Sequence, residues 1–280
     1  MDPIAAQALP ALEVRRDSQD PRVLLVRLDD PDRRNVMSAT MTGSWVALVE
    51  TLRGLSERPG GEHEVRAVVL TGAGSAFSSG AELSWLAHGT GAGAPVEELR
   101  ARMAGYYDDW LSLRAVGLPV VAAVNGAAVG AGLGLALACD VRLVGVCARL
   151  SVPFTALGMH PGMGTTHTLV AAAGPAVARE LLLTGRVVDA DEAVRLGLAT
   201  SVHPDDELVE AALATARTVA SRAPVATRLL LRGLADGGHR DLPGALRWEA
   251  LAQAVTLATD DLTEGLVAAG ERRAPRFTGR

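Results

Sequence analysis

The sequence predicts an α/β fold with a helical region at its C-terminal end. Three continuously apolar segments have the composition of strands that are buried on both faces of a parallel sheet: 65–72, 119–126 and 141–146. A tight loop rich in glycine or serine and then a short helix follow each of the first two segments, and beyond about residue 174 the pattern becomes helical. We therefore predict an α/β core over residues 1–200 and a helical region over residues 201–280.

The N-terminal elements show clear start and stop signals. "LEVRRD" and "RVLLVRLDD" are predicted as two short strands, with Asp17, Asp20 and Pro21 forming the turn between them. Ser38 is placed as the N-cap of a helix that runs to about Leu55. The apolar face of that helix carries Met41, Trp45, Leu48, Val49 and Leu52.

In the middle of the chain, "HGTGAGAP" (88–95) is predicted to be a mobile loop, and a helix is expected from Val96 to Val116. Further along, Asp189 and Glu192 form a capping box, and Gly197 stops the short helix that they begin. The segment "DDELVEAALATARTVASRAP" has one apolar stripe, and another long helix is expected over 242–258.

Composition excludes several classes of protein. A net charge of −5 and 3% aromatic residues argue against nucleic-acid binding. All 27 basic residues are arginine, so P-loop NTPases, Schiff-base aldolases and pyridoxal enzymes, which need a lysine, are excluded. We find no membrane-spanning or secretion signal and expect a cytoplasmic protein. Cys139 and Cys147 are predicted to be buried thiols, and no metal site is expected.

The segment "AAVNGAAVGAGLGLALACD" (122–140) has four interior glycines in an apolar run, although each one weakens a helix by roughly 0.5–1 kcal/mol relative to alanine. A dinucleotide fingerprint would need glycine at 135, where the chain has Leu135. Close packing accounts for Gly132 and Gly134 in part. A second loop, "FSSGAEL" (77–83), also lies between a buried strand and a helix. Two such loops can direct two main-chain N–H groups at one oxygen, forming an oxyanion hole.

These motifs resemble the crotonase (enoyl-CoA hydratase/isomerase) superfamily. The similar segments are "RAVVLTGAGSAFSSGAEL", "LPVVAAVNGAAVGAGLGLALACDVRLV", "ALGMHPGMGTTHTL", "ELLLTGRVVDADEAVRLGLATSV" and "ERRAPRF", within residues 12–278. The resemblance implies a spiral of ββα units, a helical C-terminal trimerisation region, and a trimer or hexamer. It also implies a cytoplasmic enzyme that processes acyl-CoA in fatty-acid or related metabolism. Coenzyme A would be part of the substrate, with no separate cofactor and no nucleic-acid or membrane partner.

The resemblance also implies roles for particular residues. The amides of Ala81 and Ala131 would hold the thioester oxygen and stabilise an enolate. Arg273, Arg276 and Phe277 would reach the coenzyme A of a neighbouring subunit. The other positions expected to bind coenzyme A or the acyl group are Arg34, Val36, Ser78, Ser79, Gly80, Leu83, Gly130 and Phe154.

The chain departs from the family at its acid–base positions. The two hydratase glutamates correspond to Gly134 and Phe154, and a carboxylate of isomerase relatives corresponds to Gly162. His160 is the candidate replacement base, with an exposed or carbonyl-bonded histidine as the alternative. We expect a lyase or isomerase with atypical acid–base residues. The alternative is an acyl-CoA carrier that kept the oxyanion hole and lost its chemistry.

Overall fold

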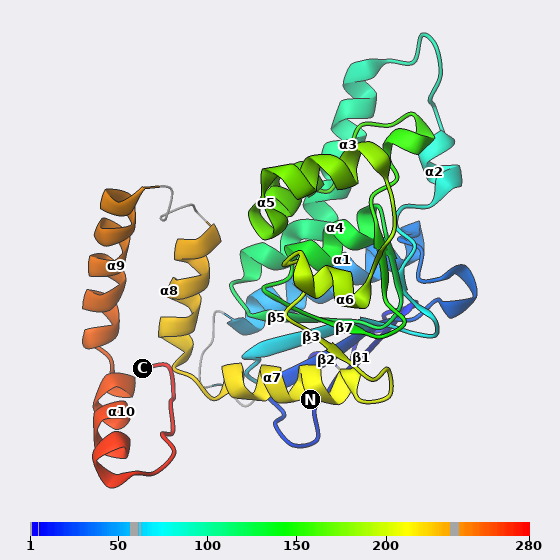
Figure 1. Cartoon of the computed structure of the whole chain (residues 1–280). Helices are drawn as coiled ribbons and strands as arrows, with labels where there is room; N and C mark the ends of the chain where they lie inside the picture. Colours follow the sequence, from blue (N-terminus) through cyan, green and yellow to red (C-terminus); the bar gives the residue numbers. More distant parts are fainter. Residues whose placement is uncertain (1, 5, 57–60, 62, 236–240) are drawn as a thin grey trace.

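The computed structural model describes residues 2–4, 6–56, 61, 63–235 and 241–280 (Figure 1). A six-stranded sheet has the order β1-β2-β3-β5-β7-β10. Its strands are β1 (Leu12–Arg16), β2 (Val23–Leu28), β3 (Ala67–Gly72), β5 (Val120–Val124), β7 (Val141–Gly145) and β10 (Ser201–His203). Strands β1 and β2 form an antiparallel hairpin, and the other neighbours are parallel. The predicted strands at 12–17, 22–30, 65–72, 119–126 and 141–146 are confirmed to within a few residues.

A second, smaller sheet contains the strands that place the site. It has the order β4 (Ala76–Ser78), β6 (Ala127–Val129), β8 (Arg149–Ser151) and β9 (Val188–Asp189). Strands β4, β6 and β8 each follow a long strand of the first sheet after a short loop, and they pair in parallel. The chain thus repeats a unit of one long strand, one short strand and a helix, which confirms the predicted ββα architecture.

Helices cover both faces of the larger sheet (Figure 1). On one face lies α7 (Leu208–Ala220), whose predicted apolar stripe packs on alternate residues of the strands, such as Val23 and Leu25. The opposite face is covered by α1 (Ala39–Ser56), α3 (Val96–Leu111), α4 (Ala131–Ala138) and α5 (Thr165–Thr184), with α2 (Leu83–Ala87) and α6 (Ala190–Arg195) nearby. Because both faces are covered, the central strands are apolar at successive positions.

The C-terminal helices are α8 (Pro224–Ala235), α9 (Leu242–Leu257) and α10 (Asp260–Glu271), beside the core in Figure 1. The region beyond residue 174 is not wholly helical as predicted, since β9 and β10 lie within it; strands of two and three residues are too short to show a period in the sequence. The predicted division at residue 200 stays a prediction. No helix of the described chain is both long and apolar enough to span a bilayer.

Two other predictions need correction. The helix expected over 96–116 ends as an α-helix at Leu111 and continues as a 3-10 helix to Val116. Cys139 is buried as predicted, but Cys147 is exposed, because it lies in the turn between β7 and β8. The capping box is confirmed: the Asp189 side chain accepts a hydrogen bond from the amide of Glu192.

The glycines of the 122–140 segment allow two loops to approach each other closely. A Cβ atom at Gly126 would overlap the carbonyl oxygen of Ser75, and one at Gly132 would overlap that of Ser78. In the facing loop, a Cβ at Gly80 would lie 2.5 Å from the Val129 carbonyl oxygen. Gly126 thus lets the loop after β5 pack against the loop after β3, while Gly80 and Gly132 let the loop after β4 pack against the end of β6 and the start of α4.

We predict that Gly126→Ala lowers the free energy of unfolding by about 1–3 kcal/mol, because the added methyl group meets rigid backbone atoms. The matched control is Gly43→Ala in α1, where a Cβ has no neighbour within 4 Å. That change should be neutral or stabilising by up to about 1 kcal/mol, because alanine is the better helix former. Urea unfolding of the three proteins measures the difference, and equal stabilities for the two variants would contradict the packing argument.

Asp17 and Arg217 join the end of β1 to α7 through an ion pair of 2.6 Å, with both side chains largely buried. The hydrogen bonds from Arg217 lower the pKa of Asp17 below its ordinary value. The pair therefore stabilises the fold above the pKa of the unfolded aspartate, about 3.9, and this contribution is lost as the pH falls through the lower pKa of the folded state.

Asp17→Asn should lower the free energy of unfolding at pH 7 by about 1.5–3 kcal/mol, since a charged hydrogen-bonded partner is lost. The deficit should shrink progressively below about pH 4. Glu50→Gln is the control, because Glu50 pairs with Arg53 on the exposed face of α1 and the pair should contribute well under 1 kcal/mol. Chemical denaturation at a series of pH values tests both; a deficit that is constant down to pH 2 would disprove the linkage.

Candidate active site

A pocket of about 80 Å³ lies where the two close-packed loops meet α3 and the segment after β8. The loop at the start of α2 contributes Ser79, Ala81 and Leu83, and the start of α4 contributes Gly130 and Ala131. The segment after β8 contributes Phe154, His160 and Gly162, and α3 contributes Met103, Tyr106 and Tyr107. Seven predicted site residues therefore line one pocket: Ser79, Ala81, Leu83, Gly130, Ala131, Phe154 and His160.

The amides of Ala81 and Ala131 lie free at this pocket. Within the described chain, neither N–H group donates to a protein acceptor. The two loops are in contact here, because a Cβ on Gly80 would lie only 3.1 Å from the nitrogen of Ala131. Gly80 and Gly130, which precede these two amides, both have positive φ, +88° and +55°, a conformation that glycine adopts without strain. Ala131 is also the first residue of α4, where the helix dipole adds positive potential.

The segment that contains Arg34 and Val36 runs beside the first loop. The Arg34 carbonyl accepts from the amide of Ser79 at 2.9 Å, and the amide of Met37 donates to the Gly80 carbonyl at 2.9 Å. The Ser78 hydroxyl is buried and donates to the carbonyl of Asn35 at 2.8 Å. Four predicted site residues therefore lie next to the pocket-lining loop but do not line the pocket themselves: Arg34, Val36, Ser78 and Gly80. The Arg34 side chain is exposed.

Asn35 fixes this border. It is fully buried, has positive φ, and its side-chain amide donates to the carbonyls of Ala73 at 2.9 Å and Ala76 at 2.7 Å. Its side-chain oxygen accepts from the amide of Asp30 at 2.9 Å. One side chain therefore ties the 30–36 segment to the loop that carries Ala81.

The three positions without a carboxylate have different surroundings. A Cβ at Gly134 would lie 2.6 Å from the Cβ of Met163, so this glycine serves packing. The ring of Phe154 comes within about 3.7 Å of the Cβ position of Gly130 and makes that wall apolar. Gly162 faces the ring of Tyr107. No Asp or Glu is among the described residues that line the pocket.

His160 is exposed and lines the pocket mouth. Its Nδ1 lies 2.7 Å from the carbonyl oxygen of Pro161. Because a carbonyl only accepts, Nδ1 carries the proton in this contact and Nε2 keeps the lone pair of a base. The structure therefore shows the exposed, carbonyl-bonded histidine that the sequence left as one alternative, and a role for His160 as the base stays a prediction.

Sequence reasoning missed both tyrosines of the chain, Tyr106 and Tyr107, which line this pocket. Tyr106 stacks on Trp85 of α2 with 4.7 Å between ring centroids, and its buried hydroxyl has no partner within the described chain. Burial raises the pKa of both phenols, so both stay protonated donors near neutral pH. The available signal was "YYDDW", a pair of tyrosines in a chain with 3% aromatic residues.

The three C-terminal residues predicted to bind coenzyme A lie outside the pocket of this chain. Arg273 pairs with Glu264 at 2.6 Å, and the amide of Arg276 donates to the same carboxylate at 2.7 Å. The carbonyl of Phe277 accepts from Arg66 at 2.9 Å. None of the three lines the pocket of its own chain, so their expected contact with a neighbouring subunit stays a prediction.

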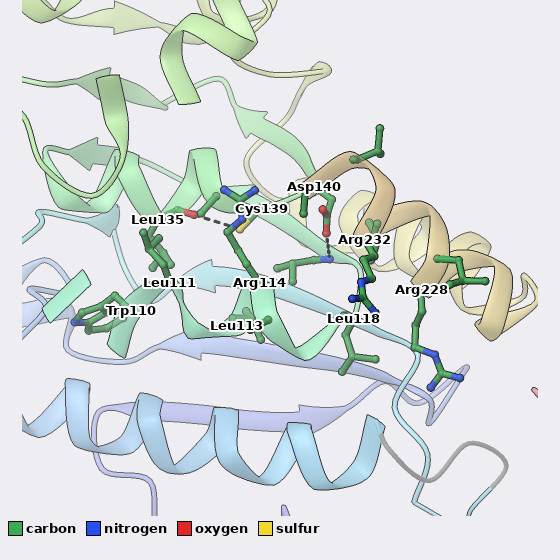
Figure 2. A pocket seen from close by; sticks show the side chains of 18 residues that line it. Trp110, Leu111, Leu113, Arg114, Leu118, Leu135, Cys139, Asp140, Arg228 and Arg232 are labelled. Atoms are coloured by element: carbon green, nitrogen blue, oxygen red, sulfur yellow. Dashed lines mark hydrogen bonds between the residues drawn. The ribbon is translucent and has the colours of Figure 1, made fainter. Parts of the chain in front are cut away.

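A larger cavity of about 560 Å³ separates α8 from the ends of α3 and α4 (Figure 2). Its acidic group, Asp140, accepts a hydrogen bond from the amide of Val120 at 2.8 Å, and Cys139 donates to the carbonyl of Leu135 at 3.4 Å. Arg228 and Arg232 enter it from α8 (Figure 2), and Arg228 donates to the Ser56 carbonyl. The Asp140 bond thus joins the end of α4 to β5, and the Arg228 bond joins α8 to the end of α1. Glu82 likewise pairs with Arg33, at 3.6 Å.

Comparison with known proteins gives one consistent family. The enoyl-CoA hydratase/isomerase family matches residues 18–280. "Probable enoyl-CoA hydratase EchA14" of Mycobacterium tuberculosis is 42% identical over 259 residues, 91% of this chain and 96% of that protein. The 2,3-dehydroadipyl-CoA hydratase of Escherichia coli is 33% identical over 263 residues, 94% of this chain and 98% of that protein.

Solved structures of similar proteins point to the same family. Enoyl-CoA hydratase from Bacillus anthracis superposes with a TM-score of 0.82 at 34% identity, covering 96% of this chain and 100% of that one. An enoyl-CoA hydratase from Polaromonas gives 0.84 at 27% identity, covering 95% and 99%. The ββα repeat, the two close-packed loops and these matches along nearly the whole length lead to one assignment: the chain belongs to the enoyl-CoA hydratase/isomerase family, the crotonase superfamily.

Proposed function

We propose that the chain binds an acyl-CoA thioester in this pocket and stabilises an enolate through the amides of Ala81 and Ala131. The observation that supports this proposal is the pair of free N–H groups at the junction of the two loops. A thioester oxygen gains negative charge when the α-carbon loses a proton or when a nucleophile adds to the β-carbon. Donors already held in place stabilise that charge without reorganising.

The surroundings of these amides favour such chemistry. Ala131 is buried, and Phe154, Met103 and Met163 give the pocket apolar walls. A lower local dielectric strengthens the interaction of an N–H group with a developing negative charge. Coenzyme A would enter as part of the substrate, along the segment with Arg34 and Val36, and we propose no other cofactor.

We assign the proton transfer to His160. Its Nε2 is free of the Pro161 bond, and it lines the pocket in which no carboxylate is present among the described residues. Transfer of the α-proton to Nε2 would give an imidazolium and an enolate, and the same nitrogen would return the proton to carbon. The proposed reaction class is a lyase or isomerase step through the enolate, with this atypical base.

An acyl-CoA carrier without catalysis is the second candidate. It is favoured by the lack of a carboxylate along the described pocket walls and by the apolar ring of Phe154 at a hydratase glutamate position. Carrier and enzyme share the bound state and differ only in whether the α-proton exchanges.

Incubation with butyryl-CoA in heavy water separates the two functions. The enzyme should place deuterium at the α-carbon, detected by NMR or mass spectrometry. A carrier should bind the ligand in calorimetry without exchange. Absence of binding for butyryl-CoA and crotonyl-CoA alike, relative to free coenzyme A, would refute the proposed function altogether.

The amide donor can be removed at Ala131, because proline is tolerated at the first position of a helix and has no N–H group. We predict that Ala131→Pro lowers exchange by about 10²–10³-fold, the usual effect of losing one oxyanion donor. Ala131→Gly is the matched control, since it keeps the N–H and should retain exchange within about threefold. The test compares the exchange rates of the two variants with that of the wild type, after circular dichroism has shown that all three proteins are equally folded. An unchanged exchange rate in Ala131→Pro would reject the donor role.

His160→Ala should lower α-proton exchange by about 10²-fold or more, in the range of general acid–base catalysis, and leave butyryl-CoA affinity nearly unchanged. His167→Ala is a suitable control, because His167 is also an exposed histidine and does not line the pocket. Unchanged exchange in His160→Ala would remove this residue from the mechanism.

We also propose that the chain forms the trimer or hexamer expected for its family. Supporting this, α8–α10 expose seven leucines by more than half of their surface: Leu230, Leu234, Leu242, Leu246, Leu251, Leu257 and Leu266. So many exposed apolar side chains are unusual for a monomer. Light scattering after size exclusion should give three or six times the 29.0 kDa of one chain, and a monomer at micromolar concentration would contradict the proposal.

A further inference from the structure

The Tyr107 hydroxyl occupies the space that a side chain at residue 162 would take. A Cβ atom built on Gly162 would overlap the Tyr107 oxygen and would lie 3.1 Å from its Cζ and 3.3 Å from its Cε1. Gly162 is buried, and both residues line the pocket. The phenol from α3 thus reaches the pocket wall at the position where isomerase relatives are expected to carry a carboxylate.

This wall presents hydroxyl groups that lack an acceptor. Tyr106 is 7% exposed and lines the same pocket, and its oxygen has no hydrogen-bond partner within the described chain. No hydrogen bond of Tyr107 to another described residue is present either. Of the two, only the Tyr106 oxygen is a fully buried donor without a partner within the described chain; the Tyr107 side chain is half-buried, so its hydroxyl can reach a ligand in the pocket.

We propose that Tyr107 is a specificity-determining residue that donates a hydrogen bond to an oxygen on the acyl chain, beyond the thioester carbonyl. This inference rests on the proposed function. The ligand class is a short acyl-CoA with a keto or hydroxyl oxygen on its chain. A pocket of about 80 Å³ favours a short acyl chain over a long one.

The charge state of the wall fits a donor. Burial raises the pKa of Tyr107, so the phenol keeps its proton at neutral pH and can donate. No carboxylate lines the described pocket to compete as acceptor or to repel an oxygen. His160, at the mouth, already gives its Nδ1 proton to the Pro161 carbonyl. Tyr107 therefore remains the half-buried donor nearest Gly162.

Calorimetry with acetoacetyl-CoA and butyryl-CoA tests the proposal, because these ligands have the same chain length and differ by one keto oxygen. The wild-type protein should bind acetoacetyl-CoA at least fivefold more tightly. In Tyr107→Phe the two affinities should agree within twofold, while butyryl-CoA binding changes by less than twofold. A preference that is absent from the wild type, or that persists in Tyr107→Phe, overturns the proposal.

Two further variants locate the effect. Tyr106→Phe removes the neighbouring hydroxyl and should retain at least half of the preference. Gly162→Ala keeps both hydroxyls but displaces the Tyr107 ring, so the preference should fall at least threefold. An unchanged preference in Gly162→Ala, or its loss in Tyr106→Phe alone, contradicts the assignment to Tyr107.

The same titrations separate the two proposals. If neither acyl-CoA binds more tightly than free coenzyme A, the proposed function fails. If butyryl-CoA binds and the keto oxygen adds nothing, the proposed function stands and only the role of Tyr107 is rejected. Thermal unfolding of each variant confirms that the folds are comparable.

Discussion

The close approach of two backbone loops is the constraint on which the rest of this structure depends. Gly126, after β5, allows contact with the carbonyl of Ser75, and Gly132, at the start of α4, allows contact with that of Ser78. Gly80 approaches the Val129 carbonyl from the opposite loop. Backbone atoms can approach this closely only where no Cβ intervenes. The contact aligns β4 with β6, and it brings Ala81 and Ala131 to one pocket although they are fifty residues apart in sequence. A side chain at any of these glycines would push the two loops apart and so separate the amides of Ala81 and Ala131.

A pocket built in this way presents donors almost exclusively. The two amides, the tyrosine hydroxyls and apolar walls surround the space, and no carboxylate lines its described part. His160 also lines the pocket, and its Nδ1 lies 2.7 Å from the carbonyl oxygen of Pro161.

The C-terminal helices lie away from the pocket and expose much of their apolar surface. In a single chain they leave seven leucines largely exposed, and Arg273 is bound to Glu264 away from the pocket. Asp261, which is buried, accepts from the amides of Thr278 and Gly279 and so folds the last residues back along α10. The conformation of the terminal segment is thereby fixed within one chain, whereas its apolar face is available for contacts between chains.

The sequence by itself determined the class of fold. Strands buried on both faces are visible as continuous apolar runs, and the two glycine-containing loops mark where a backbone must approach another backbone. The empty acid–base positions, Gly134, Phe154 and Gly162, were also visible in the sequence. Only the tertiary structure decided which glycines serve packing, and that Tyr107 fills the space beside Gly162. Periodicity reports which face of an element is buried, but not which residue of a distant helix will meet it. The contact between residues 107 and 162 depends on how α3 packs across the chain, and no local pattern encodes that packing.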